Sequence, residues 1–561
     1  AEALLQRILE INPDNAEALS AYADVCAAEE DWEAVEQSIL RLGRLVSDPA
    51  QQTDIYLRLG KLYHEHLPNP ERAEMAYLDV LKRAPDHVGA REALVSLHLD
   101  DGDTNKAFEQ QNALVAGAKS HADKCRHTVR LAEIHEAAGD LKEAEQVLVK
   151  ARRSWNKEPG PVIALYRFYK RTGQEPAADL LLDRAAAEVR RGLGAGRFEA
   201  PLFALAKMVA EMRDQADAAV IADSTLGAIE GRSARLEGAG DRAGESSLDE
   251  HTAPEIFTEP FRQMLEATGY LLDLAAPFDI GSLRAKPLPP NEAAAADRIL
   301  EIAAGYGLVD VNVVATNALG RVVIPAHCSP PSLVLGLQLI TSEREDVREF
   351  LVHRACKALQ TRTAAFARTA PIDLWPLLGA YLKVHSPSFE PQGVDTAKVA
   401  VFYQAMAPHA PKFGPQMSLL ASEVISSIGN RASSLNTASN AWGSRTALLA
   451  SGDPNLALEA IAWAAGNSQG PPGAGPERVR WIGRQAEARD LIVFSIGDGY
   501  AAARAALGLS TSTILPSATP AAAPSYEVGH EEVERPAMDS IPESEEGEVI
   551  DDIEFLEEDF D

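Results

Sequence analysis

The sequence has little positive charge, few cysteines and no long hydrophobic run. It contains 53 Lys and Arg against 83 Asp and Glu, so its formal charge is −30 at pH 7. Such a chain repels a nucleic-acid backbone, which argues against a nucleic-acid partner. The cysteines are far apart and form no CxxC pair, which favours a reducing compartment, and we predict a cytoplasmic location. They are Cys26, Cys125, Cys328 and Cys356.

No apolar segment is long enough to cross a bilayer. The stretch SLVLGLQLI at 332–340 has about half of the roughly 20 residues that a spanning helix needs, so we expect no membrane insertion. The chain begins with Ala, inside the helical pattern AEALLQRILEINPDN, and no charged start precedes an apolar run. This opening is typical of the second helix of a repeat, and we expect more repeats before it.

Internal repetition organises the first part of the chain. Small and large apolar residues have the spacing of a helix pair at Leu131, Ala132, His135, Ala144, Leu148 and Ala151. The same offsets recur 34 residues later, at Leu165, Tyr166, Tyr169, Ala178, Leu182 and Ala185. One such pair cannot bury its apolar face alone, so the pairs must stack on one another.

This period resembles the tetratricopeptide repeat family. The stretch YLRLGKLYHEHLPNPERAEMAYLDVLKRAP is similar to its Leu-Gly-x-x-Tyr first helix, its Ala-x-x-x-Phe second helix and its terminal Pro. The resemblance implies about six helix pairs over residues 1–230, wound into a right-handed superhelix whose groove binds peptides or partner helices. Tyr56 and Tyr63 are candidate groove residues, and the alternative for both is core packing.

Composition divides the rest of the chain. Residues 231–253 are rich in Gly, Ser and charge, which predicts a linker. Residues 254–510 contain an amphipathic segment, then the strand-like runs LVDVNVVAT and RVVIP on either side of the turn residues NALG, then helices. Residues 511–561 are predicted to be a disordered acidic tail. The expected fold is therefore mainly α, with a tetratricopeptide superhelix, a mostly helical α+β domain and this tail.

The tail contains apolar residues within its acidic run. Residues 525–561 hold 16 acidic residues and one basic residue, Arg535. On a helix, Ile553, Leu556 and Phe560 have the i, i+3, i+7 spacing of anchors in a groove. Phe555, Leu556 and Phe560 are therefore candidate partner-binding residues, whether on another protein or on this chain's own repeats. The alternative is a solubilising tail, because charge runs are usually solvated.

A zinc-peptidase pattern is present without most of its chemistry. REFLVHRACKAL at 348–359 places a histidine where an HExxH motif begins. The run from Asp346 to His353 resembles gluzincins of the CAAX prenyl protease type, as does the preceding IPAHCSPPSLVLGLQLI. LNTASNAWGSRTALLASGDPNLALEAI resembles the segment around that family's ExxAD motif. The resemblance covers roughly residues 300–465.

The residues at the matching positions are unsuitable for catalysis. His353 stands at the first ligand position, but Arg354 replaces the general-base Glu, Lys357 replaces the second His, and Asn436 falls at the Glu ligand. Two cations would repel a metal dication, and Arg cannot accept a proton at neutral pH. We predict a non-catalytic protein-binding scaffold, a pseudoenzyme without a cofactor.

Three alternatives stay open, and one of them is a purely structural fragment with no partner at this end. The chain could be a zinc-dependent metallopeptidase or another hydrolase with displaced ligands. A structural metal could also use His327, Cys328, His353 and Cys356, since the last two share one helix face. Adjacent His327 and Cys328 would then both have to turn towards one metal, and this spacing matches no common zinc module. A buried Cys beside a core or surface His is the simpler interpretation.

Overall fold

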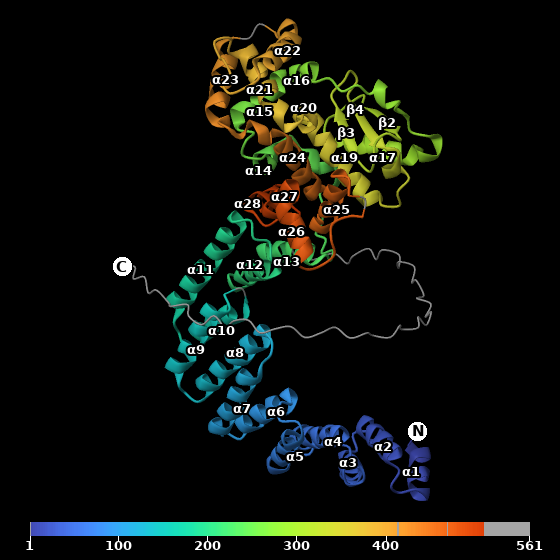
Figure 1. Ribbon diagram of the computed structural model, residues 1–561, viewed down its shortest axis with the longest axis vertical. Coiled ribbons are helices and arrows are strands. Elements are labelled where there is room, and N and C mark those ends of the chain that lie inside the picture. Colours follow the sequence, from blue (N-terminus) through green and yellow to red (C-terminus); the bar gives the residue numbers. More distant parts are fainter. Residues whose placement is uncertain (1, 157, 412–413, 468, 510–561) are drawn as a thin grey trace, which may run out of the picture. The chain divides into compact units, whose positions relative to one another are not determined.

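A computed structural model describes residues 2–156, 158–411, 414–467 and 469–509. Within these ranges the protein is mainly α-helical, and its strands form one four-stranded sheet (Figure 1). Helix pairs of the tetratricopeptide type come first, and a mostly helical α+β domain follows, as the sequence predicts. Among the described residues, no helix is both long and apolar enough to span a bilayer. The predicted tail, with Phe555, Leu556 and Phe560, lies outside the described residues.

Six helix pairs follow α1 in the repeat region. The helices are α1 (Glu2–Ile11), α2 (Ala16–Ala28), α3 (Trp32–Leu45), α4 (Pro49–Lys61), α5 (Pro70–Arg83), α6 (Val88–Asp100), α7 (Thr104–Gly117), α8 (His121–Ala137), α9 (Leu141–Ser154), α10 (Gly160–Arg171), α11 (Glu175–Gly194), α12 (Ala200–Met212) and α13 (Ala216–Glu230). The small residues Ala73, Ala144 and Ala178 are fully buried between helices. Their size lets neighbouring helices approach closely, which explains the period in the sequence.

The second domain combines one small sheet with many helices. Its main helices are α15 (Glu259–Thr268), α16 (Tyr270–Ala275), α17 (Ala293–Gly305), α18 (Leu337–Ile340), α19 (Glu345–Gln360), α20 (Ala364–Arg368), α21 (Pro371–His385), α22 (Thr396–Met406), α23 (Pro415–Ile428), α24 (Leu435–Ser451), α25 (Pro454–Ala464), α26 (Pro476–Arg484), α27 (Ala486–Ser495) and α28 (Asp498–Ala506). The strands are β1 (Lys286–Pro287), β2 (Asn312–Thr316), β3 (Val323–Ala326) and β4 (Ser332–Gly336).

The sheet has the order β1-β2-β4-β3. β4 pairs in parallel with β2 and antiparallel with β3, so the two strand-like runs around NALG are not neighbours. Every residue of β4 is buried, whereas β2 begins exposed. β4 is buried along its whole length because it lies inside the sheet, where both of its faces are covered.

The predicted linker, residues 231–253, is instead a packed part of the fold. It contains η2 (Gly240–Gly244), η3 (Ser246–Leu248) and α14 (Asp249–Thr252), and Leu236 is 0% exposed. The backbone N–H of Leu236 donates to the carbonyl of Gly452 at 2.8 Å. At Gly238 a Cβ would lie 2.1 Å from the carbonyl oxygen of Ala450, so glycine permits this close approach to α24. The linker prediction was wrong because this segment buries its few apolar residues against other helices.

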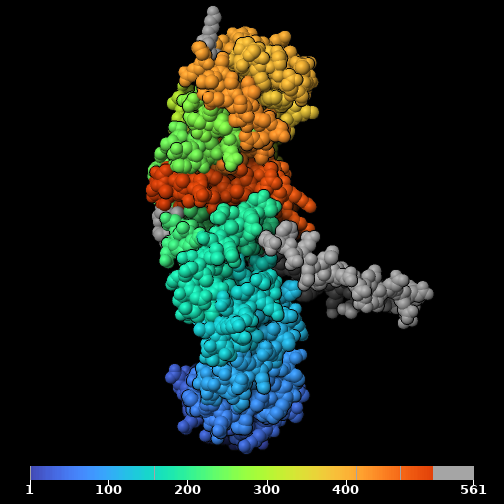
Figure 2. All heavy atoms as spheres, turned by 90° about the vertical axis from the view of Figure 1, so that its left-hand side faces the viewer, coloured from blue at the N-terminus to red at the C-terminus, as the bar shows by residue number. Residues whose placement is uncertain are grey.

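The hydrophobic core continues from the last repeats into the second domain. One cluster of buried residues includes Leu182 and Ile229 from the repeats and Phe350 and Leu491 from later helices. The hydroxyls of Thr225 on α13 and Ser495 on α27 are 3.1 Å apart. Figure 2 shows the C-terminal helices (red) against the last repeats (teal and green). The change in composition after residue 230 therefore does not mark a break in the hydrophobic core.

Replacing Leu236 by Ala should lower the free energy of unfolding by about 2–5 kcal/mol, because the change leaves a cavity in a closed core. Denaturant titration of the full chain measures this loss. Arg235→Ala in the same segment is the control, since Arg235 is exposed and should change stability little. Equal unfolding midpoints for the two variants would contradict the packing of this segment.

Candidate functional site at helices α19 and α24

The zinc-motif helix, α19, packs closely against α24. Its residues are buried over most of its length, from Val347 to Leu359. Gly443 of α24 faces its backbone, and a Cβ there would lie 2.5 Å from the carbonyl oxygen of Arg354. The positions singled out by the sequence therefore lie in a crowded interior.

His353, at the position of the first metal ligand, is a core residue. It is 3% exposed, and its Nδ1 lies 3.0 Å from the Tyr306 hydroxyl. Burial lowers the pKa of His353 to about 4, because the charged ring would lose its hydration. The imidazole is therefore neutral at pH 7, and Tyr306 occupies one of its two nitrogens.

Arg354, at the position of the general base, forms a bidentate ion pair with Glu487 of α27. The Nε and Nη2 atoms donate to the two carboxylate oxygens at 2.8 and 3.0 Å. The hydroxyl of Ser444, on α24, also donates to Glu487, at 2.5 Å. The Glu487 carboxylate thus has both a charged partner and well-placed hydrogen-bond donors. These contacts hold α27 against α19 and α24.

Lys357, at the position of the second histidine, is also buried and paired. It is 1% exposed, forms an ion pair with Asp249 of α14, and donates to Gln360 at 2.7 Å. Its Nζ also lies 5.7 Å from the centre of the Trp442 ring. Burial lowers the pKa of Lys357, and the Asp249 carboxylate opposes that shift. The carboxylate comes from the segment that the sequence predicted to be a linker.

Asn436, at the position of the glutamate ligand, caps another helix. Its Nδ2 donates to the carbonyl of Ala367 at 2.6 Å and lies 3.3 Å from the carbonyls of Phe366 and Thr369. These carbonyls belong to the C-terminal end of α20, where the last backbone acceptors have no partner within the helix. Asn436 therefore satisfies backbone groups of α20.

The four residues considered for a structural metal do not form a metal-binding cluster. His327 Nδ1 lies 4.0 Å from Asp273, which pairs with Arg368 at 3.1 Å. Cys356 is fully buried in the core, where desolvation raises its pKa. In the described part of the chain, no group of three or more His, Cys, Asp or Glu side chains is placed to hold a metal ion.

The two candidate groove tyrosines differ in accessibility. Tyr63, in the π-helical turn η1 (Leu62–His66), is 6% exposed, and its hydroxyl donates to Glu36 at 2.5 Å. Tyr56 is half-buried, and the Arg83 guanidinium lies over its ring at 4.3 Å from the centroid. Tyr63 is thus a core residue, contrary to the groove assignment, because its ring fills the space between consecutive repeats.

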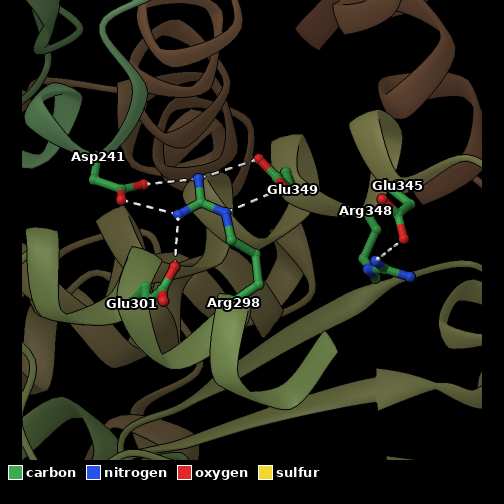
Figure 3. Close-up of polar contacts among 6 residues, drawn as sticks. All are labelled: Asp241, Arg298, Glu301, Glu345, Arg348 and Glu349. Atoms are coloured by element: carbon green, nitrogen blue, oxygen red, sulfur yellow. Dashed lines mark hydrogen bonds and ion pairs between the residues drawn. The ribbon is translucent and has the colours of Figure 1, made fainter. Parts of the chain in front are cut away.

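A network around Arg298 was not visible in the sequence. Figure 3 shows this guanidinium between three carboxylates from different elements. Its Nη1 and Nη2 donate to Asp241 at 3.0 and 3.1 Å, Nε donates to Glu349 at 3.1 Å, and Nη1 donates to Glu301 at 3.3 Å. These carboxylates raise the pKa of Arg298. The network ties η2 to α17 and α19, and its members are too far apart in sequence to form a motif.

A cavity of about 410 Å³ lies beside the Lys357 pair. Asp249, Gln360 and Trp442, all neighbours of Lys357, belong to its lining, and Glu259 and Glu266 on α15 complete one wall. The lining carries more carboxylates than cations, and Arg262 is its one lining cation. Lys357 itself is almost fully buried and does not belong to the lining.

Comparisons with known proteins find similar solved structures but no relative by sequence. No family model matches the chain, and no curated protein matches it. Similar solved structures include a tetratricopeptide repeat protein from Parabacteroides merdae, with 15% identity over 40% of this chain and 84% of its own length, at a TM-score of 0.25. The type IV pilus biogenesis factor PilW is 17% identical. The match covers 38% of this chain and 92% of PilW, with a TM-score of 0.24.

A third similar structure is Naa15/Naa10 bound to HypK-THB. It has 15% identity over 83% of this chain and 60% of that chain, with a TM-score of 0.25. At such TM-scores these likenesses carry no argument about function. The tetratricopeptide assignment rests on the helix pairs and their spacing.

The low pKa of His353 predicts acid sensitivity. The unfolded chain binds a proton on this residue below its ordinary pKa of 6.5, whereas the folded chain binds it only below about 4. Stability is therefore lost as pH falls through this interval, by about 3 kcal/mol at most for His353. We expect His353→Gln to remove this part of the loss in unfolding titrations between pH 7 and pH 4. The exposed His409→Gln is the control, and identical pH profiles for the two variants would contradict the assignment.

Proposed function

We propose that this chain is a non-catalytic scaffold that binds partner polypeptides, and that its second domain is a degenerate gluzincin-like fold, a pseudoenzyme. The proposal rests on the ion pairs that Arg354 and Lys357 form with Glu487 and Asp249. Both cations stand at positions where the gluzincin mechanism needs a base and a ligand, and each is paired with a partly buried carboxylate.

Electrostatics supports this interpretation. A dication near His353 would be repelled by two fixed positive charges in an environment of low dielectric constant. Removing either cation would leave Glu487 or Asp249 without its partner in a poorly hydrated site, which is strongly destabilising. The residues around α19 are therefore suited to holding helices together, and a cytoplasmic scaffold needs no cofactor.

The alternative function is a zinc-dependent metallopeptidase or other hydrolase with displaced ligands. Its only support is the resemblance around residues 300–465. Zinc content separates the two functions, because the alternative requires a bound metal near α19.

Purified full-length chain should contain no stoichiometric zinc by elemental analysis and should cleave no peptide substrate. A second sample is incubated with zinc and dialysed before elemental analysis, because zinc could be lost during purification. One zinc per chain that disappears in the His353→Ala variant would support the hydrolase. Since His353 is buried, an unfolding titration should accompany that variant.

The repeats provide the surface for the proposed partner. Several charges on the first helices are already paired between neighbouring repeats, as in Asp24–Arg58 and Glu136–Arg171. Lys61 on α4 and Arg167 on α10 are exposed and form no ion pair within the part of the chain that the structure describes. They can therefore contact a partner without first losing an intramolecular pair, and we place them in the partner-binding surface.

The double variant Lys61→Glu/Arg167→Glu should lose captured partners while its unfolding midpoint stays unchanged. Lys150→Glu is the matched control, because Lys150 is exposed on a second helix, α9. Affinity capture with tagged full-length protein, read by mass spectrometry, compares the partner sets. If both variants keep every partner of the wild type, the first helices are not the binding surface.

The acidic tail is a second proposed ligand. Phe555, Leu556 and Phe560 would act as apolar anchors within its negative charge, either on a partner or on this chain's own repeats. Only the amino-acid sequence supports this part of the proposal, because the tail lies outside the described residues.

A further inference from the structure

Helices α24 and α27 lie side by side and form the floor of an open groove with a volume of about 600 Å³. On α24 the lining residues include Thr437, Ala441 and Arg445, which follow one another at intervals of four positions. On α27 they recur at Ala486, Arg489, Asp490 and Val493, with i, i+3, i+4 and i+7 spacing. The groove therefore follows one face of each helix, and the small residues of these faces make it deep.

The lining of the groove mixes apolar residues with charged ones, among them Glu255, Arg431 and Arg489. Ile256, from the loop before α15, lines one side, and Leu193 at the end of α11 lines another. Val493 is 39% exposed although it is aliphatic. An exposed aliphatic side chain such as Val493 can pack against the apolar face of another helix.

Two arginines at the groove lack carboxylate partners. Arg445 is already neutralised by Asp490 at 2.6 Å, but Arg431 and Arg489 form no ion pair with any residue in the described part of the chain. Both are exposed, and Arg431 donates only to the carbonyl of Ser427. Glu255 also lines the groove, so its lining carries three arginines against the two carboxylates Glu255 and Asp490, whereas the whole chain has a formal charge of −30.

We propose that this groove binds an acidic amphipathic helix of a partner polypeptide. Apolar side chains of that helix would pack against Val493, Leu193 and the small floor residues, and its carboxylates would pair with Arg431 and Arg489. Arginine suits this role because its planar guanidinium binds a carboxylate through two hydrogen bonds. The site is distinct from the first-helix surface of the repeats.

A helix fits the groove better than an extended peptide does. An added strand needs a free sheet edge, whereas the backbone groups of α24 and α27 are hydrogen-bonded within their own helices. A nucleic acid would offer negative charge without apolar anchors, and the whole chain would repel it. The combination of small and aliphatic lining residues with two unpaired arginines therefore favours an acidic amphipathic segment.

The probe is a labelled peptide of residues 547–561, which has acidic residues and apolar residues at helical spacing. It is added to the full-length chain, and fluorescence anisotropy at low salt measures the dissociation constant. Arg431→Glu combined with Arg489→Glu should weaken binding by about tenfold or more, since two charge-assisted contacts are lost. The Arg→Lys pair should weaken binding less than the Arg→Glu pair, because it keeps the charge but loses the two-bond geometry. Arg480→Glu is the matched control, because Arg480 is exposed on α26 outside the groove.

The anchors are tested with a second peptide in which Ile553, Leu556 and Phe560 are Ala. We expect it to bind about tenfold more weakly or worse at unchanged charge. Equal binding of the two peptides, or unchanged affinity of the Arg→Glu pair, would overturn the proposal.

The source of the occupant is tested with a chain that ends at Ser517, which keeps the compact unit of residues 1–517. Equal affinity of this chain and the full-length chain supports a partner in trans. A gain of about tenfold or more on truncation would instead mean that the chain's own last residues compete for the groove, which overturns the assignment to a partner. The variants at Lys61 and Arg167 lie elsewhere, so failure here would be separate from failure of the repeat surface.

Discussion

The buried ion pair between Lys357 and Asp249 is the constraint on which the arrangement around α19 depends. An ammonium group in this interior is strongly unfavourable unless a carboxylate accompanies it. The carboxylate comes from α14, so residues 231–253 must be held in place for the core to form. Arg298 and Asp241 hold the same segment at η2. A segment with the composition of a linker thus becomes a fixed connection between the repeats and the second domain.

The last repeats and the second domain share one hydrophobic core. The last repeat helix, α13, packs on helices that follow the sheet by more than a hundred residues, and the buried Arg478 donates to the carbonyl of Ala228 at 2.6 Å. The second domain therefore continues the repeat core through shared apolar packing. A partner bound on the repeats would be held by a surface that this domain helps to stabilise.

The residues on and around α19 that the sequence pattern singled out all make structural contacts. Each position that would serve a metal in a gluzincin makes a contact that holds two elements together: His353 with Tyr306, Arg354 with Glu487, Lys357 with Asp249, and Asn436 with the end of α20. Such contacts favour a permanent, closed interior. The surfaces that stay available are the first helices of the repeats and the groove between α24 and α27, and both suit the binding of polypeptides.

The sequence by itself determined the repeats, because the small residues that let helices approach must recur at a constant interval. It also predicted the two strand-like runs that form β2 and β3. Only the tertiary structure decided where Asp249, Glu487 and Arg298 find their partners, that β4 lies between β2 and β3, that Tyr63 is in the core, and that residues 231–253 are packed. The physical reason is the range of the interactions. Helical periodicity is a property of neighbouring residues, whereas ion pairs and burial join residues that are distant in sequence and are selected only when the whole chain has closed its core.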